Sequence, residues 1–290
     1  MPQMVDISNN NGYEIVNDVV IPSVDFNGLK RAGIILVGMK ASQGGGYADP
    51  TFVSYWKKCE DYEFWRLAYC FMNPDDPDLG SMGDEDETSG LFARQIERAG
   101  GLRDKDLLAL DCEAGSGNRL DFVARTLELI EDRCGVRPGK YSASWYTHFH
   151  GLESVELEKY WSWWADYSGK LGVLPVGWCN PLIWQTGVGP IEGMNGDFDL
   201  DEILVPINDL LARGYNGGND MIELNDDDKE IYLKLCEGTF TGAEKIAAIL
   251  GKYGAQGQSA AYWVQSAIKA GVVLSKELTG TNTAVSGGSN

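Results

Sequence analysis

Asp111 and Glu113 have the residue types and the spacing best suited to acid–base chemistry in this chain. They follow the apolar run at residues 107–110, which reads as a buried strand. Side chains alternate along a strand, so both carboxyl groups are expected to face the same way. Burying unpaired like charges is costly, and such a pair raises one pKa while the other group stays ionised. That difference suits an acid/base or acid/nucleophile couple. Two other readings stay open, namely acids at a solvent-facing rim and acids that bind a cation.

Alternating apolar and helical segments must position these acids. We predict strands at residues 4–8, 34–42, 65–72, 107–113, 140–144, 160–167, 182–186 and 196–201. We predict helices at residues 49–62, 87–99, 120–133 and 206–213. Strands that alternate with helices indicate βαβ units and a mostly parallel sheet. The last strands lie too close together for full helices between them, so the pattern predicts an α/β fold with a barrel-like sheet that is helix-poor at its end.

Polar residues occur near the carboxyl ends of several of these strands, where barrels of parallel strands carry their functional groups. They are Asp6, Ser8, Lys40, Ser42, Asp111, Glu113, Ser142, Asp166 and Gln185. Delivery of polar groups to one rim by independent strands is stronger evidence for a site than any single pair.

Composition narrows the class of partner. The net charge of −19 argues against binding to nucleic acid or to an anionic membrane surface, but not against binding to carbohydrate, and we expect no insertion into a membrane. The chain has no run apolar enough to span a bilayer and opens without a basic-then-apolar leader. None of the six cysteines forms a C-x-x-C pair, which favours buried free thiols over disulfides or a zinc site. We predict neither a metal site nor a cofactor.

The 290 residues suffice for one large domain with a small appendage. We assign residues 1–213 to the barrel and the Gly/Asn-rich residues 214–222 to a linker. Apolar residues at helical spacing place a small all-α module at residues 223–278. The Gly/Ser/Thr-rich residues 279–290 are expected to be a disordered tail.

Several ordered motifs point to a known family. They are 5–12 (VDISNNNG), 39–44 (MKASQG) with 49–50 (DP), 67–71 (LAYCF), 110–113 (LDCE), 141–142 (YS), 164–167 (WADY), 183–185 (IWQ) and 198–199 (FD). Together, in this order, they resemble glycoside hydrolase family 25, the Chalaropsis-type muramidases. The resemblance runs from about residue 5 to about residue 201.

The resemblance implies an irregular TIM-like (β/α)5(β)3 barrel. It also implies a lysozyme that cleaves the β-1,4 bond between N-acetylmuramic acid and N-acetylglucosamine in peptidoglycan. Carried over by position, Glu113 is the general acid, and Asp6, Asp111 and Asp199 complete an acidic cluster. The second step is attack either by a carboxylate or by the substrate's own N-acetyl oxygen. The Asp-x-Glu pair favours the latter, with net retention of configuration.

Further side chains are assigned to substrate binding. Tyr69, Tyr141 and Trp184 are candidates for stacking on sugar rings, although core packing is the alternative for each ring. Lys40 is either a substrate contact or the counter-ion of the acidic cluster. Gln185 and Asp166 reach the same rim from later strands.

The family implies a biological setting. We expect a bacteriophage endolysin that has no signal peptide and stays in the host cytoplasm until membrane permeabilisation lets it reach the cell wall. The helical module would bind the wall or make a homo-oligomer. Two alternatives stay open: a chitinase or endo-N-acetylglucosaminidase on a similar barrel, and a non-catalytic wall-binding virion protein.

Overall fold

Eight strands form a closed barrel in the computed structural model, which describes residues 3–17, 19–179 and 181–215. The nine-stranded sheet closes because β1 pairs with β4 as well as with β11, and β5 (Tyr47–Ala48) is appended to β4. The barrel strands are β1 (Met4–Ile7), β4 (Leu36–Gln43), β6 (Trp65–Phe71), β7 (Leu107–Asp111), β8 (Gly139–Ala143), β9 (Ser162–Ala165), β10 (Pro181–Pro190) and β11 (Asp197–Ile203).

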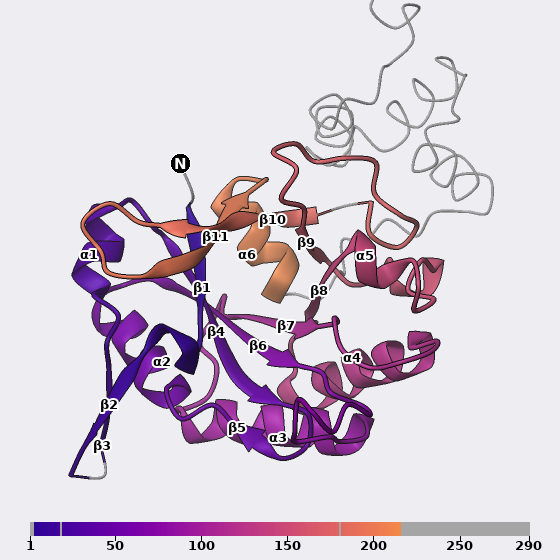
Figure 1. The fold of residues 1–290 in the computed structure, drawn as a ribbon, viewed down its shortest axis with the longest axis horizontal. Coiled ribbons are helices and arrows are strands. Elements are labelled where there is room, and N and C mark those ends of the chain that lie inside the picture. The colour runs from indigo at the N-terminus through magenta and orange to yellow at the C-terminus, as the bar shows by residue number, and fades with distance from the viewer. Residues whose placement is uncertain (1–2, 18, 180, 216–290) are drawn as a thin grey trace, which may run out of the picture.

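Helices join the first six barrel strands, which run parallel, and lie around the barrel (Figure 1). They are α1 (Phe26–Arg31), α2 (Phe52–Asp61), α3 (Glu85–Arg98), α4 (Leu120–Cys134) and α5 (Ser144–Thr147), with short 3-10 turns at Asn9–Asn11 and Val155–Leu157. β10 is parallel to β9, whereas β11 runs antiparallel to both β10 and β1. This order confirms the predicted α/β fold, with five β/α units followed by strands that lack full helices.

Alternation along the strands separates two apolar layers. On β7, Leu108 and Leu110 pack outward beneath the helices, while Leu107 and Ala109 belong to a second cluster inside the barrel. Leu210 and Leu211 of α6 (Ile207–Tyr215) join the first residues of the strands in that inner cluster, so α6 closes the amino end of the barrel. Asp111 continues the inward series and therefore faces the interior at the opposite, carboxyl end.

The hairpin of β2 (Tyr13–Val16) and β3 (Val19–Pro22) was not predicted. It extends away from the barrel, and Ile15 is 63% exposed (Figure 1). α2 begins at Phe52 rather than at residue 49, because the Asp49 carboxylate accepts hydrogen bonds from the backbone amides of Asn9 and Thr51. β10 is longer than predicted and has a register shift between Gln185 and Gly187.

A buried ion pair lies outside the predicted site. Arg66 on β6 and Asp106, just before β7, are 2% and 1% exposed, and the guanidinium contacts both carboxylate oxygens. The Nε–Oδ1 distance is 2.9 Å. The Arg66 guanidinium also lies 4.0 Å from the ring centroid of Trp56. This pair ties two neighbouring strands together where they enter the barrel.

Four cysteines are free thiols as predicted, with Cys59, Cys70 and Cys112 buried and Cys134 half-buried. Cys179 corrects the prediction because it is disulfide-bonded. Cys236 lies outside the described residues.

The predictions for the C-terminal part fall largely on residues that the structure does not describe. Helix α6 extends to Tyr215 and so includes the first two residues of the predicted linker. The rest of that linker, the helical module at 223–278 and the tail at 279–290 lie outside the described residues. Within the described ranges, no helix combines the length and apolar character needed to cross a membrane.

Candidate active site

Asp6 is the centre of a buried hydrogen-bond network inside the barrel. The Tyr69 hydroxyl donates to Asp6 Oδ1 at 3.2 Å, and Gln185 Nε2 donates to Asp6 Oδ2 at 2.9 Å. The Tyr141 hydroxyl in turn donates to Gln185 Oε1 at 2.8 Å. All four side chains are less than one-tenth exposed. Strands β1, β6, β8 and β10 therefore each supply one side chain to this buried hydrogen-bond network.

Asp199 brings a second carboxylate to Asp6. The two residues are direct partners in the antiparallel pairing of β1 and β11, so their side chains lie on the same face of the sheet. Burial raises the pKa of Asp6 well above its ordinary value, and the nearby Asp199 charge raises it further. The hydrogen bonds from Gln185 and Tyr69 act in the opposite direction. Burial also raises the pKa of Asp199.

Asp111 and Glu113 approach Asp6 from β7. Asp111 ends the strand with 6% of its surface exposed, and half-buried Glu113 lies just beyond it. Burial raises the pKa of Glu113 to about 7, with a further contribution from Asp199, while Lys40 opposes the shift. Burial and then the Glu113 charge raise the pKa of Asp111 well above its ordinary value. The structure therefore brings together all four members of the acidic cluster, Asp6, Asp111, Glu113 and Asp199.

Asp111 also carries an unused acceptor. Its Oδ1 is buried and has no hydrogen-bond partner among the described residues. A buried carboxyl oxygen without a partner is unfavourable, so a donor supplied from outside the chain would improve its environment. This oxygen is therefore the point of the acidic cluster that could most clearly accept a hydrogen bond from a bound molecule.

Lys40 lies where a counter-ion would lie. Its ammonium donates to Gln43 Oε1 at 2.7 Å and sits 4.7 Å from the ring centroid of Phe71. Its positive charge favours the ionised forms of Asp111 and Glu113. The charge therefore limits the repulsion within the acidic cluster.

The structure does not join Trp184 and Asp166 to this network. Trp184 alternates with Gln185 on β10 and so lies on the other face of the sheet, where its indole N–H donates to the Asp166 carbonyl at 2.9 Å. The Asp166 carboxylate accepts from the Ser168 amide at 2.9 Å and thereby stabilises its own loop. Neither side chain shares a hydrogen bond with the four acids.

The sequence of this chain identifies the family to which it belongs. The model for glycosyl hydrolases family 25 matches residues 5–194, which include most of the barrel. The chain belongs to glycosyl hydrolases family 25. The match covers Asp6, Asp111 and Glu113, and ends shortly before Asp199.

Known proteins are similar to this chain in sequence or in fold. The autolytic lysozyme of Clostridium acetobutylicum is 25% identical over 218 residues, covering 73% of this chain and 63% of that protein, so the chain spans less than two thirds of its length. The lysozyme structure from Streptomyces coelicolor is 21% identical with a TM-score of 0.59, covering 74% and 97% of the two chains. The catalytic domain of endolysin ply40 from bacteriophage P40 of Listeria monocytogenes is 21% identical with a TM-score of 0.55, covering 73% and 97%. The two structures share the fold of this family 25 chain.

Three further residues of this family 25 site were not predicted from the sequence. The Tyr167 hydroxyl donates to Gln185 Oε1 at 2.5 Å, although its side chain is 57% exposed. Trp163 and Asp201 lie deeper, where the indole N–H donates to Asp201 Oδ1 at 2.7 Å. Asp201 follows Asp199 by two residues, which is the one sequence signal that it shares the inward face of β11.

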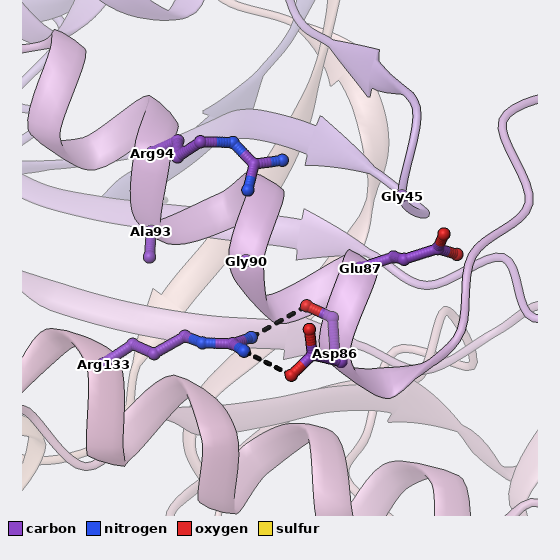
Figure 2. Close-up of a pocket in the computed structure, with 7 residues that line it drawn as sticks. All are labelled: Gly45, Asp86, Glu87, Gly90, Ala93, Arg94 and Arg133. Atoms are coloured by element: carbon purple, nitrogen blue, oxygen red, sulfur yellow. Dashed lines mark hydrogen bonds and ion pairs between the residues drawn. The ribbon is translucent and has the colours of Figure 1, made fainter.

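A separate pocket of about 560 Å³ lies between α3, α4 and the turn at Gly45 (Figure 2). Arg133 of α4 reaches across it to Asp86 at the start of α3 (Figure 2). None of the predicted site residues lines this pocket. It is a groove of the outer helical layer and forms no part of the acidic cluster.

Proposed function

We propose that this family 25 glycosidase cleaves the β-1,4 bond between N-acetylmuramic acid and N-acetylglucosamine in bacterial peptidoglycan. The observation that carries the proposal is the environment of Glu113, a half-buried carboxyl group whose pKa is raised to about 7 beside other carboxylates. A glycosidase needs one carboxyl group that holds a proton at neutral pH and negative charge near the developing oxocarbenium ion. Family membership supports the same reaction class.

In the first step, Glu113 transfers its proton to the oxygen that leaves with N-acetylglucosamine. The bond from that oxygen to C1 of N-acetylmuramic acid breaks, and its electron pair stays with the oxygen. Positive charge then develops at C1 and the ring oxygen. The ionised members of the acidic cluster stabilise this charge in a site where little water screens them.

We propose that the substrate's own N-acetyl carbonyl oxygen attacks C1. The free Oδ1 of Asp111 is a suitable acceptor for the N–H of that acetamido group, and this contact would hold the group in position. Water then attacks C1 as Glu113 accepts its proton, and the acetamido group is regenerated with net retention at C1. Direct attack by a carboxylate, with Asp6 or Asp199 as nucleophile, is the competing mechanism.

The product ends test which bond is cut. Digestion of purified peptidoglycan, followed by borohydride reduction and sugar analysis, should yield reduced muramic acid. Reduced glucosamine would instead identify an endo-N-acetylglucosaminidase, and cleavage of chitin in preference to peptidoglycan would identify a chitinase. Either of these two results would overturn the proposed substrate bond.

The raised pKa of Glu113 predicts the pH dependence of activity. Because the general acid must be protonated, kcat should be lost as pH rises through about 7, by about tenfold per pH unit above that value. Rates of hydrolysis of a soluble glycan fragment between pH 5 and pH 9 would measure this limb. A rate that stays constant to pH 9 would contradict the assignment of Glu113.

We propose bacteriophage-induced host lysis as the biological role, with the enzyme held in the host cytoplasm until membrane permeabilisation admits it to the wall. The fold shared with the bacteriophage endolysin ply40 supports this role. The autolytic lysozyme of Clostridium acetobutylicum supports the alternative that a bacterium makes the enzyme to remodel its own wall. We assign wall binding to residues 223–278, with oligomerisation as the alternative.

A further inference from the structure

Asp201 is a buried carboxyl group that the proposed reaction does not use. It lies on β11, two residues beyond Asp199, and its side chain is fully buried. One oxygen, Oδ1, accepts the hydrogen bond from Trp163 Nε1 at 2.7 Å. The other, Oδ2, has no partner among the described residues. Burying a carboxyl group that makes a single hydrogen bond is unfavourable, so the presence of Asp201 at this position needs an explanation.

The surroundings of Asp201 favour its neutral form. Burial is the main cause that raises its pKa well above the ordinary value, and the charges of Asp6 and Asp199 raise it further. The hydrogen bond from Trp163 opposes this shift. In either protonation state Oδ1 serves as the acceptor for the Trp163 indole N–H.

Trp163 connects Asp201 to Tyr69 and Tyr141, the two tyrosines of the Asp6 hydrogen-bond network. The indole makes edge-to-face contacts with Tyr141 and Tyr69, at centroid distances of 4.8 Å and 5.9 Å. Trp163 is only 2% exposed, and its ring is confined by the two tyrosines and by the hydrogen bond to Asp201. A shift of the indole would move both phenol rings.

Those two tyrosines control Asp6. Tyr69 donates directly to Asp6, while Tyr141 donates to the Gln185 side chain that in turn donates to the other oxygen of Asp6. Among the described residues, both side-chain hydrogen bonds to the Asp6 carboxylate therefore depend on rings packed against one indole. Misplacing a catalytic group by about 1 Å can cost roughly 100-fold in rate.

We propose that Asp201 is a positioning residue, which orients Trp163 and thereby sets the Tyr69 and Tyr141 hydroxyls that hold Asp6. The proposal rests on the proposed function, because it assigns Asp201 to the same site. Asp201 contributes the acceptor oxygen and not a proton, so an amide in its place fulfils the same role.

Two substitutions at one position separate the acceptor from the acid. Asp201→Asn keeps an oxygen for the indole N–H, whereas Asp201→Leu has similar volume and no acceptor. On a soluble peptidoglycan fragment, the full-length Leu variant should lose about 10- to 100-fold in kcat with KM changed less than twofold. The Asn variant should stay within about threefold of the parent. Trp163→Phe, which removes the same bond from the other side, should resemble the Leu variant and replaces it if that variant does not fold.

Hydrogen exchange of the Trp163 indole N–H, followed by NMR, gives a readout independent of activity. The signal is assigned as the one missing in Trp163→Phe, and its exchange should be slow in the parent and in Asp201→Asn but fast in Asp201→Leu. If the parent does not cleave peptidoglycan, the proposed function fails while this exchange pattern still tests Asp201. Equal kcat for the Leu variant and the parent overturns the positioning role. An Asn variant as impaired as the Leu variant also overturns it, since the acid itself would then be required.

Discussion

Glu113→Gln is expected to lower kcat for peptidoglycan cleavage by about 1,000-fold, within the range that general acid catalysis contributes. The amide has nearly the same shape but no proton to give to the leaving oxygen. In the parent, burial and the charge of Asp199 raise the pKa of Glu113, so that its carboxyl group can act as an acid near neutral pH. Loss of turbidity of purified Gram-positive cell walls and release of reducing ends from a soluble fragment would measure the effect.

The controls separate lost chemistry from lost folding or binding. Glu156→Gln makes the same change at an exposed position and should have parental activity. Glu113→Gln should sediment with cell walls as the parent does. If it clears walls as fast as the parent, Glu113 is not the general acid. If the parent binds walls but releases no reducing ends, the protein is a non-catalytic wall-binding protein.

The folding stability of Glu113→Gln gives an independent check with a defined sign. A carboxyl group whose pKa is raised in the folded state binds a proton more tightly there than in the unfolded chain. Its ionisation therefore destabilises the fold as pH rises from the unfolded pKa of about 4.3 towards 7. The Gln variant should have the higher Tm at pH 8, and the difference should vanish near pH 4.

Asp106→Asn is expected to produce the largest loss of stability, about 3–5 kcal/mol in the free energy of unfolding. The change leaves the buried Arg66 guanidinium without its main counter-charge. Among the described residues, Glu60 is the other acid in range of Arg66, but its carboxylate lies 3.7 Å away and its side chain is 58% exposed. Denaturant titration followed by tryptophan fluorescence would measure the loss.

Two comparisons test the cause. Glu63→Gln removes one partner of the exposed Lys30–Glu63 pair and should leave stability nearly unchanged. Replacing both buried partners, as Arg66→Met with Asp106→Leu, should recover much of the loss, because neither buried charge is then left alone. If the double variant is less stable than Asp106→Asn, the buried charge is not what destabilises the single variant.

Much of the barrel could be predicted from the sequence because its strands are short apolar runs that end in polar residues. The run before Asp111 is typical, since its inward and outward residues are both apolar until the carboxyl end. The adjacency of Asp6 and Asp199 could not be derived in this way. It requires β11 to turn antiparallel and pair with β1, a contact between the two ends of the barrel that no local pattern specifies.

Side-chain direction was the weaker part of the prediction. Trp184 looked like a sugar-stacking ring, but the register of β10 sends Gln185 into the barrel and Trp184 to the other face. Asp166 looked like a rim acid, but a short loop of its own uses the carboxylate. Asp201 was not predicted as a site residue because the predicted strand ended there, whereas β11 continues to Ile203.

The closure of the barrel between β1 and β11 has a consequence for the order of folding during synthesis. β1 leaves the ribosome first and can pair with β4 early, yet its other partner is the last barrel strand to be made. Because Asp6 and Asp199 are partners in the pairing of β1 with β11, the acidic cluster is complete only when the barrel has closed. A nascent chain that stops before β11 therefore lacks Asp199 and the strand pairing that brings it to Asp6, and we expect such a fragment to be inactive.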